Sequence, residues 1–339
     1  MRRPAWARLS AEGLLDRRFC DLAGLRLKGS ILEPCIRRLY DELAARRLRF
    51  RPHFWIGTEW FCPDGIPGVA VPFYLCHPRL LQLERRQMLE AEGGTMESCL
   101  RILRHECGHA IDNAFRLRRR RAVRAVFGPA TTRYPDTYTP APQSRRYVLH
   151  LAGWYAQSHP VEDFAETFAV WLRPGRHWRR AYRGWPALAK LELMDELMRD
   201  LAGRRPVVTD RSVVDPVAGQ RTRLRTHYRR RRERYDVRAA AVHDHDVRRL
   251  FSDDPRHRDR TPAAAFLRRL RAELRERVAR WTGQHAYTVD QVLAQMIARC
   301  QALGLRCARP ARELRLDALA LVTAHTAELV HVGRFELTL

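Results

Sequence analysis

Two histidines and a glutamate form the pattern H-E-x-x-H at residues 105–109. His105 and His109 are four residues apart, so on an α-helix both imidazoles project from one face about one turn apart. Such a pair can bind one Zn²⁺, while Glu106 between them faces the open side of the ion and can serve as a general base. The spacing therefore predicts half of a hydrolytic zinc site, provided that the segment is a helix.

The residues around this motif have the apolar periodicity of a helix. Thr95 is a suitable N-cap, and an apolar stripe runs from Met96 through the motif to about Leu117. Arg116 and residues 118–121 form a basic run at the expected C-terminal end, where positive charge interacts favourably with the helix dipole. The motif is thus expected in the middle of a helix, and zinc ligation is favoured over two ordinary core histidines.

A catalytic zinc ion usually has three protein ligands and keeps its fourth position for water. The extended motif H-E-x-x-H-x-x-G-x-x-H would supply a third histidine at position 115 and a glycine at position 112. This chain has Phe115 and Asp112 at those positions, which excludes that ligand pattern. The third ligand must come from another part of the chain.

A second helix is predicted further along the chain. Pro160 suits the first turn of a helix, and Pro174 with Gly175 ends it. Glu162 and Glu166 stand on one face of this otherwise apolar helix. Burying two acids is costly unless they bind something, so this pair is the best source of the missing ligand.

These segments together resemble a known family. Residues 105–112, Tyr155 and residues 162–166 resemble the catalytic domain of anthrax-lethal-factor-type metallopeptidases. Residues 159–167 are more similar still to the bacterial family called putative zinc-binding metallopeptidases, of the gluzincin type. The resemblance covers about residues 10–200 and implies a zincin-like peptidase domain with one zinc ion.

The resemblance also implies roles for individual residues. Glu162 would be the third zinc ligand, with Asp163 as the alternative. Glu166 would be a carboxylate behind a zinc histidine, a role for which Asp112 is the less favoured candidate. Tyr155, seven residues before Glu162, would stabilise the oxyanion with its hydroxyl.

The expected reaction is hydrolysis of a peptide bond. A zinc ion lowers the pKa of its bound water to about 7, so hydroxide becomes available at neutral pH. Glu106 is expected to accept the proton and pass it to the leaving amine. The expected partner is accordingly a peptide or protein substrate.

The fold class expected from the patterns is α+β. A helix is predicted over 32–48, and strands are predicted over 54–56 and 69–75 with turns between them. Pro72 cannot donate to a strand ladder, so the second strand is placed at a sheet edge, where an extended substrate could pair with it. The expected arrangement is a small mixed sheet over the H-E-x-x-H helix and the second ligand helix.

Three regions are predicted along the chain. Residues 1–205 form the zincin-like domain, residues 206–235 a basic linker and residues 236–339 a helical accessory region. In the last region, Thr288 and Gln291 are predicted to begin a helix as a capping box.

Composition leaves a second class of function open. The net charge of +25 is compatible with nucleic acid as a partner, through the arginine runs at 118–121 and 229–232 and with a structural zinc. Only Lys28 and Lys190 among the 63 basic residues are lysines, a skew that codon bias can explain, so this alternative is not favoured. The scattered cysteines and the lack of an apolar N-terminal segment predict a cytoplasmic protein without a membrane span.

Overall fold

The computed structural model describes most of the chain, in two compact units. The described residues are 4–135, 137–175, 177–235, 244–331 and 335–336. The first unit comprises residues 1–87, 91–227 and 336–339, and the second comprises residues 88–90 and 228–335. Within the described residues, no helix has both the length and the apolar character that a membrane crossing needs.

The secondary structure is mixed, with many helices and few strands, which confirms the α+β expectation at this level. The α-helices are α1 (Ala11–Leu15), α2 (Leu32–Ala45), α3 (Pro78–Met88), α4 (Met96–Phe115), α5 (Arg121–Phe127), α6 (Pro160–Leu172), α7 (Trp178–Ala181), α8 (Ala187–Leu201), α9 (Leu224–Arg234), α10 (Asp244–Leu250), α11 (Ala263–Thr282), α12 (Ala286–Ala302) and α13 (Ala311–His331). The strands are β1 (His53–Gly57), β2 (Gly68–Pro72), β3 (Thr137–Tyr138) and β4 (Phe335–Glu336).

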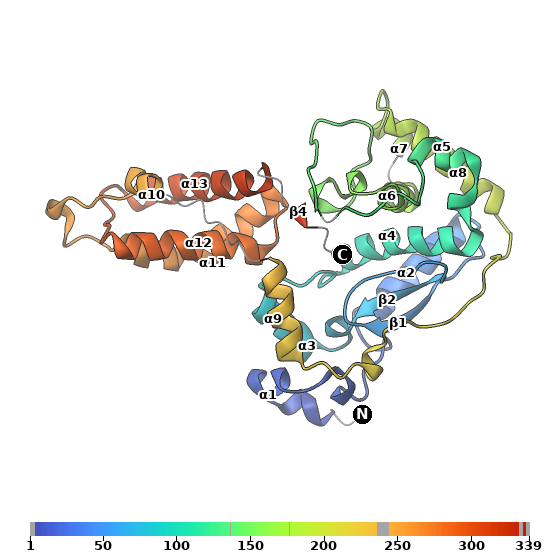
Figure 1. The fold of residues 1–339 in the computed structure, drawn as a ribbon, viewed down its shortest axis with the longest axis horizontal. Helices are drawn as coiled ribbons and strands as arrows, with labels where there is room; N and C mark the ends of the chain where they lie inside the picture. Colours follow the sequence, from blue (N-terminus) through green and yellow to red (C-terminus); the bar gives the residue numbers. More distant parts are fainter. Residues whose placement is uncertain (1–3, 136, 176, 236–243, 332–334, 337–339) are drawn as a thin grey trace. The chain divides into compact units, whose positions relative to one another are not determined.

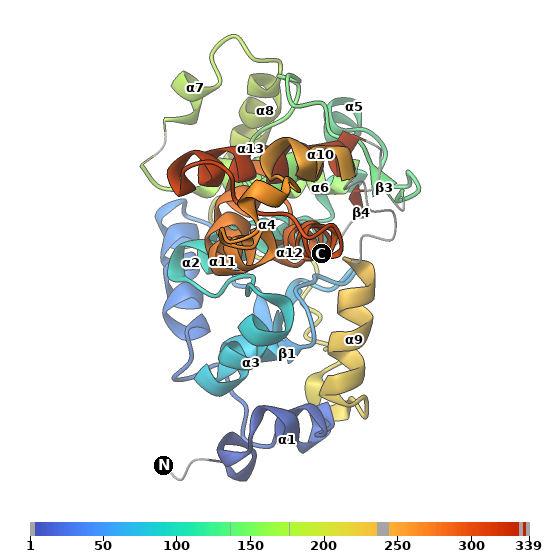
Figure 2. The same cartoon turned by 90° about the vertical axis from the view of Figure 1, so that its left-hand side faces the viewer.

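Helix α4 is the central element of the first unit. It lies between the β1–β2 sheet with α2 on one side and α6 on the other, as both ribbon views show (Figure 1, Figure 2). A buried ion pair joins α2 to α4, because Arg104 donates to both carboxylate oxygens of Glu42 at 2.7 and 2.8 Å. This pair holds the residue directly before His105 against the core.

The sheet differs in part from the expectation. Strands β1 and β2 are parallel, with Trp55 opposite Ala70, and β2 is buried along its whole length. The predicted strand end is wrong after Pro72, because Phe73–Cys76 forms a 3-10 helix. Nor is the strand a free edge at Ala70, whose N–H donates to the carbonyl of Phe61 at 2.8 Å on the side away from β1.

The two predicted ligand helices are confirmed as helices. The N-cap of α4 is Thr95, whose hydroxyl accepts from the Ser98 N–H while the Ser98 side chain accepts from the Thr95 N–H. The N-cap of α6 is His159, whose Nδ1 accepts from the Val161 N–H at 3.2 Å. The first helix ends at Phe115, and its C-cap Arg116 has a left-handed backbone conformation with φ of 54°.

The predicted linker region contains folded structure. Residues 217–219 form a 3-10 helix, and α9 begins at Leu224. The backbone N–H of Phe19 donates to the Thr222 carbonyl, and that of Leu224 donates to the Arg17 carbonyl. Residues 206–227 consequently belong to the first unit, because long-range backbone pairing holds part of them against its N-terminal segment.

The second unit packs α10 to α13 around its own apolar core, in which Leu267, Met296 and Ala318 are fully buried. The predicted capping box of α12 is wrong. That helix begins at Ala286, and its N-cap is His285, whose side chain accepts from the Tyr287 N–H. Residues 236–243, at the start of the predicted accessory region, lie outside the described residues.

Gly108 sets the distance between α4 and α6. A Cβ at this position would lie 2.7 Å from the Ala165 Cα and 3.0 Å from the Ala165 carbonyl oxygen. Real Cβ atoms do not approach backbone so closely, so a side chain at position 108 would push the helices apart.

We predict that Gly108→Ala destabilises the first unit by about 1–3 kcal/mol, the usual cost of overpacking a well-packed contact. Urea denaturation followed by circular dichroism measures this change. Gly219→Ala is the matched control, because a Cβ at Gly219 meets no atom within 4 Å. Equal stability of the two variants would contradict the close-approach argument.

Candidate metal centre

Three side-chain atoms that can ligate a metal converge between α4 and α6. His105 Nε2 lies 3.0 Å from His109 Nε2 and 3.0 Å from Glu162 Oε2, and His109 Nε2 lies 3.2 Å from the same Glu162 oxygen. Among the described residues, these three form the group of metal-type ligands. Asp163, the alternative third ligand, instead accepts from Lys190 Nζ at 2.6 Å.

The spacing of the three atoms fits a zinc ion. Ligands about 2.0–2.1 Å from a tetrahedral zinc lie roughly 3.3 Å from one another. Three lone-pair atoms this close repel one another unless positive charge lies among them. Although burial alone lowers the pKa of His105, the carboxylates of Glu162 and Glu166 outweigh it and raise that pKa to about 10. The site therefore stabilises a cation, and these donors fit zinc.

Glu166 fixes the orientation of one imidazole. Its Oε1 lies 2.8 Å from His105 Nδ1, and its Oε2 accepts from the Leu151 N–H at 2.8 Å. Since a carboxylate can only accept, His105 Nδ1 donates to Glu166, and Nε2 is the nitrogen that is directed toward His109 and Glu162 and could bind a metal ion. Glu166 thus lies behind a histidine, where the resemblance implied it.

Glu106 lies in the same buried region and has a carboxylate oxygen that is unpaired among the described residues. Its Oε2 is buried and has no hydrogen-bond partner in the described part of the chain. Burial raises the pKa of Glu106, against the opposing influence of His109 and His105. A buried carboxylate with a free oxygen and a raised pKa is suited to accepting a proton.

The Tyr155 ring lies close to the His105 ring. The two ring centroids are 5.6 Å apart, and Tyr155 belongs to a 3-10 helix, Ala152–Gln157, that precedes α6. Burial and then the charge of Glu162 raise the pKa of Tyr155 well above its ordinary value, so its hydroxyl stays protonated and can donate. Its position is compatible with the role that the resemblance implied.

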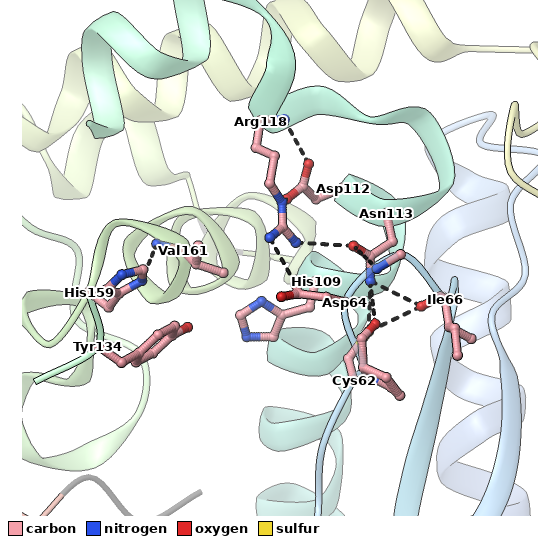
Figure 3. Close-up of polar contacts among 12 residues, drawn as sticks. Cys62, Asp64, Ile66, His109, Asp112, Asn113, Arg118, Tyr134, His159 and Val161 are labelled. Carbon is pink, nitrogen blue, oxygen red and sulfur yellow. Dashed lines mark hydrogen bonds and ion pairs between the residues drawn. The ribbon is translucent and has the colours of Figure 1, made fainter. Parts of the chain in front are cut away.

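Asp112 faces away from the histidines, toward Arg118. The Arg118 backbone N–H donates to its Oδ1 at 2.7 Å, and the guanidinium pairs with Oδ2. The same guanidinium reaches Asp64 and Asn113, as Figure 3 shows. Asp112 therefore has a different partner from the expected imidazole, because the chain turns at Arg116 and brings Arg118 back onto α4.

A cavity of about 290 Å³ opens beside these residues. Its lining includes residues that sequence reasoning did not single out, and Tyr134 is the most notable. The Tyr134 hydroxyl donates to Glu162 Oε1 at 2.6 Å. No spacing pattern in the sequence links Tyr134 to a ligand helix. The lining residues are Trp60, Phe61, Cys62, Asp64, Glu106, His109, Arg118, Ala130, Tyr134, Val161 and Glu162.

Two imidazoles, one carboxylate and a neighbouring free glutamate define a protein able to bind a metal ion of the zinc type. Residues 82–179, which carry all of these groups, match the family described as putative zinc-binding metallo-peptidase. The match confirms the resemblance to that family, while the relation to lethal-factor-type domains stays a prediction. No curated protein and no solved structure matches the chain.

We predict that Glu166→Gln weakens zinc binding by about 10- to 100-fold, the usual effect of losing a partner behind a ligating histidine. The neutral amide no longer stabilises the oriented imidazole, and it cannot accept from both His105 and the Leu151 N–H as a carboxylate does. Competition with a chromophoric chelator measures the affinity. Glu192→Gln, an exposed glutamate on α8, is the control; the same zinc affinity in both variants would contradict the role of Glu166.

Proposed function

We propose that this protein is a zinc-dependent metallopeptidase with one zinc ion per chain and a zincin-like arrangement of its two ligand helices. The observation that supports this most strongly is the convergence of His105, His109 and Glu162 on one point, with the buried Glu106 carboxylate beside it on the same cavity wall. A structural zinc site needs no free carboxylate next to its ligands, whereas hydrolysis needs a base there.

The donor set defines what each side chain does. His105, His109 and Glu162 would hold the zinc ion, which would supply Lewis-acid polarisation of a carbonyl and an activated water near neutral pH. Glu106 accepts the proton of the attacking water and delivers it to the leaving amine. The Tyr155 hydroxyl donates a hydrogen bond to the oxygen of the scissile carbonyl as negative charge develops on it. Glu166 keeps the His105 ring in the tautomer that ligation requires.

The cavity beside the candidate metal ligands is the proposed binding site for the substrate. Trp60, Phe61 and Cys62 follow one wall, and Phe61 already pairs with β2 through its backbone. The catalytic carboxylate and the ligand Glu162 line the same cavity. A peptide in this cavity would place its carbonyl within reach of both, so we propose peptides or proteins as substrates.

We predict that Glu106→Gln retains about one zinc per chain and loses peptide hydrolysis by at least about 100-fold, because general-base catalysis is removed while the ligands stay intact. Metal analysis of purified protein gives the zinc content, and mass spectrometry of a diverse peptide mixture gives the cleavage rate.

The matched control is Glu97→Gln, an exposed glutamate on the same helix, paired with Arg101. It is expected to cleave at the wild-type rate. A folded wild-type protein that takes up no zinc would refute the proposal. Steeply salt-dependent binding of nucleic acid that Glu106→Gln leaves unchanged, without any cleavage, would favour the nucleic-acid alternative instead.

A further inference from the structure

The two oxygens of Glu162 have different partners. Oε2 faces both ligand histidines, at 3.0 Å from His105 Nε2 and 3.2 Å from His109 Nε2. Oε1 accepts the hydrogen bond of the Tyr134 hydroxyl at 2.6 Å. Glu162 is 5 % exposed, so water does not compete strongly for either oxygen. The Glu162 carboxylate thus faces the two histidines with one oxygen and binds a loop tyrosine with the other.

Tyr134 is itself held by the helix that carries Glu162. Its ring stacks on the His159 ring with centroids 3.7 Å apart and an interplanar angle of 16°. His159 Nδ1 accepts from the Val161 N–H, so its Nε2 carries the proton and donates to the Thr132 carbonyl at 2.9 Å. In Figure 3 the Tyr134 ring lies against His159, and its hydroxyl points toward the side of His109. The loop around Tyr134 is therefore fastened to the N-terminus of α6 at two points.

We propose that Tyr134 is a positioning residue that leaves Glu162 a single oxygen for the metal. This inference rests on the proposed function. A carboxylate oxygen engaged by a short phenol hydrogen bond is a poorer metal ligand than its free neighbour. The carboxylate would then bind a metal ion through Oε2 alone, which would leave the position of a second oxygen open for water and substrate.

Tyr134 and Tyr155 have separate tasks in this arrangement. The Tyr155 ring lies beside the His105 ring and its hydroxyl is assigned to the substrate carbonyl, whereas the Tyr134 hydroxyl donates to a ligand. Loss of the Tyr134 hydroxyl should change metal binding itself, and loss of the Tyr155 hydroxyl should change turnover. The two tyrosines can therefore be distinguished by which quantity each affects.

The test is Tyr134→Phe in the full-length chain, which removes the hydroxyl and keeps the ring on His159. We expect zinc affinity, measured by chelator competition, to fall by about 10- to 100-fold. With Co²⁺ in place of zinc, we expect weaker visible absorption, as a second carboxylate oxygen joins the coordination shell. Tyr155→Phe should retain the wild-type affinity and Co²⁺ spectrum.

Tyr138→Phe is the matched control. Tyr138 lies in the same connecting segment and donates its hydroxyl hydrogen bond to the Gly153 carbonyl at 2.8 Å instead of to a ligand. It is expected to bind zinc as the wild type does. An equal loss of affinity in Tyr138→Phe would show a general effect of loop packing and would overturn the positioning role.

Wild-type affinity and an unchanged Co²⁺ spectrum in Tyr134→Phe would refute the role of Tyr134 and leave the peptidase proposal standing. A wild-type protein without zinc would refute both. X-ray absorption of the zinc-loaded wild type gives a decision that needs no variant: one carboxylate oxygen among the ligands supports the proposal, and a bidentate carboxylate overturns it.

Discussion

The candidate site depends on how closely α4 and α6 approach each other. Each helix carries only part of the constellation, and the parts meet because Gly108 presents no side chain to the Ala165 backbone. The contact lies within the H-E-x-x-H segment itself, at the position before His109. Packing and chemistry thus constrain the same residues: a shift of α6 that accommodated one extra carbon would move Glu162 away from the histidines. The glycine is needed for its missing side chain, since it lies in regular helix.

The same contact brings ionisable groups into a region with little water. His105, Glu162 and Glu166 are almost completely buried, and any one of them alone would be costly there. Together they stabilise one another, because the two carboxylates flank one imidazole on both nitrogens. The stability of this part of the core is therefore coupled to positive charge at the site. A divalent cation at the site would supply this positive charge in place of protons on the histidines.

Local signals explain what the sequence predicts well. Within each of α4 and α6, the cap and the apolar stripe are close in sequence, so periodicity locates both helices. The acidic residues of α6 are conspicuous among its apolar neighbours. Tyr134 offers no such signal, because it reaches Glu162 across 28 residues from a segment without periodicity. Arg118 belongs to a basic run that the sequence assigns to a helix end, and nothing in that run indicates that its guanidinium binds buried Asp112. Contacts of this kind depend on the path of the chain after each helix ends.

Arg118 also shows why the net charge of +25 is a poor guide to the site. Its guanidinium joins the end of α4 to the loop before β2 through Asp112, Asn113 and Asp64. Around the cavity this arginine is accompanied by three carboxylates, those of Asp64, Glu106 and Glu162. The cavity is consequently acidic within a strongly basic chain, and its local field favours a cation over a nucleic-acid phosphate. The distribution of charge, more than its sum, agrees with a metal-dependent site.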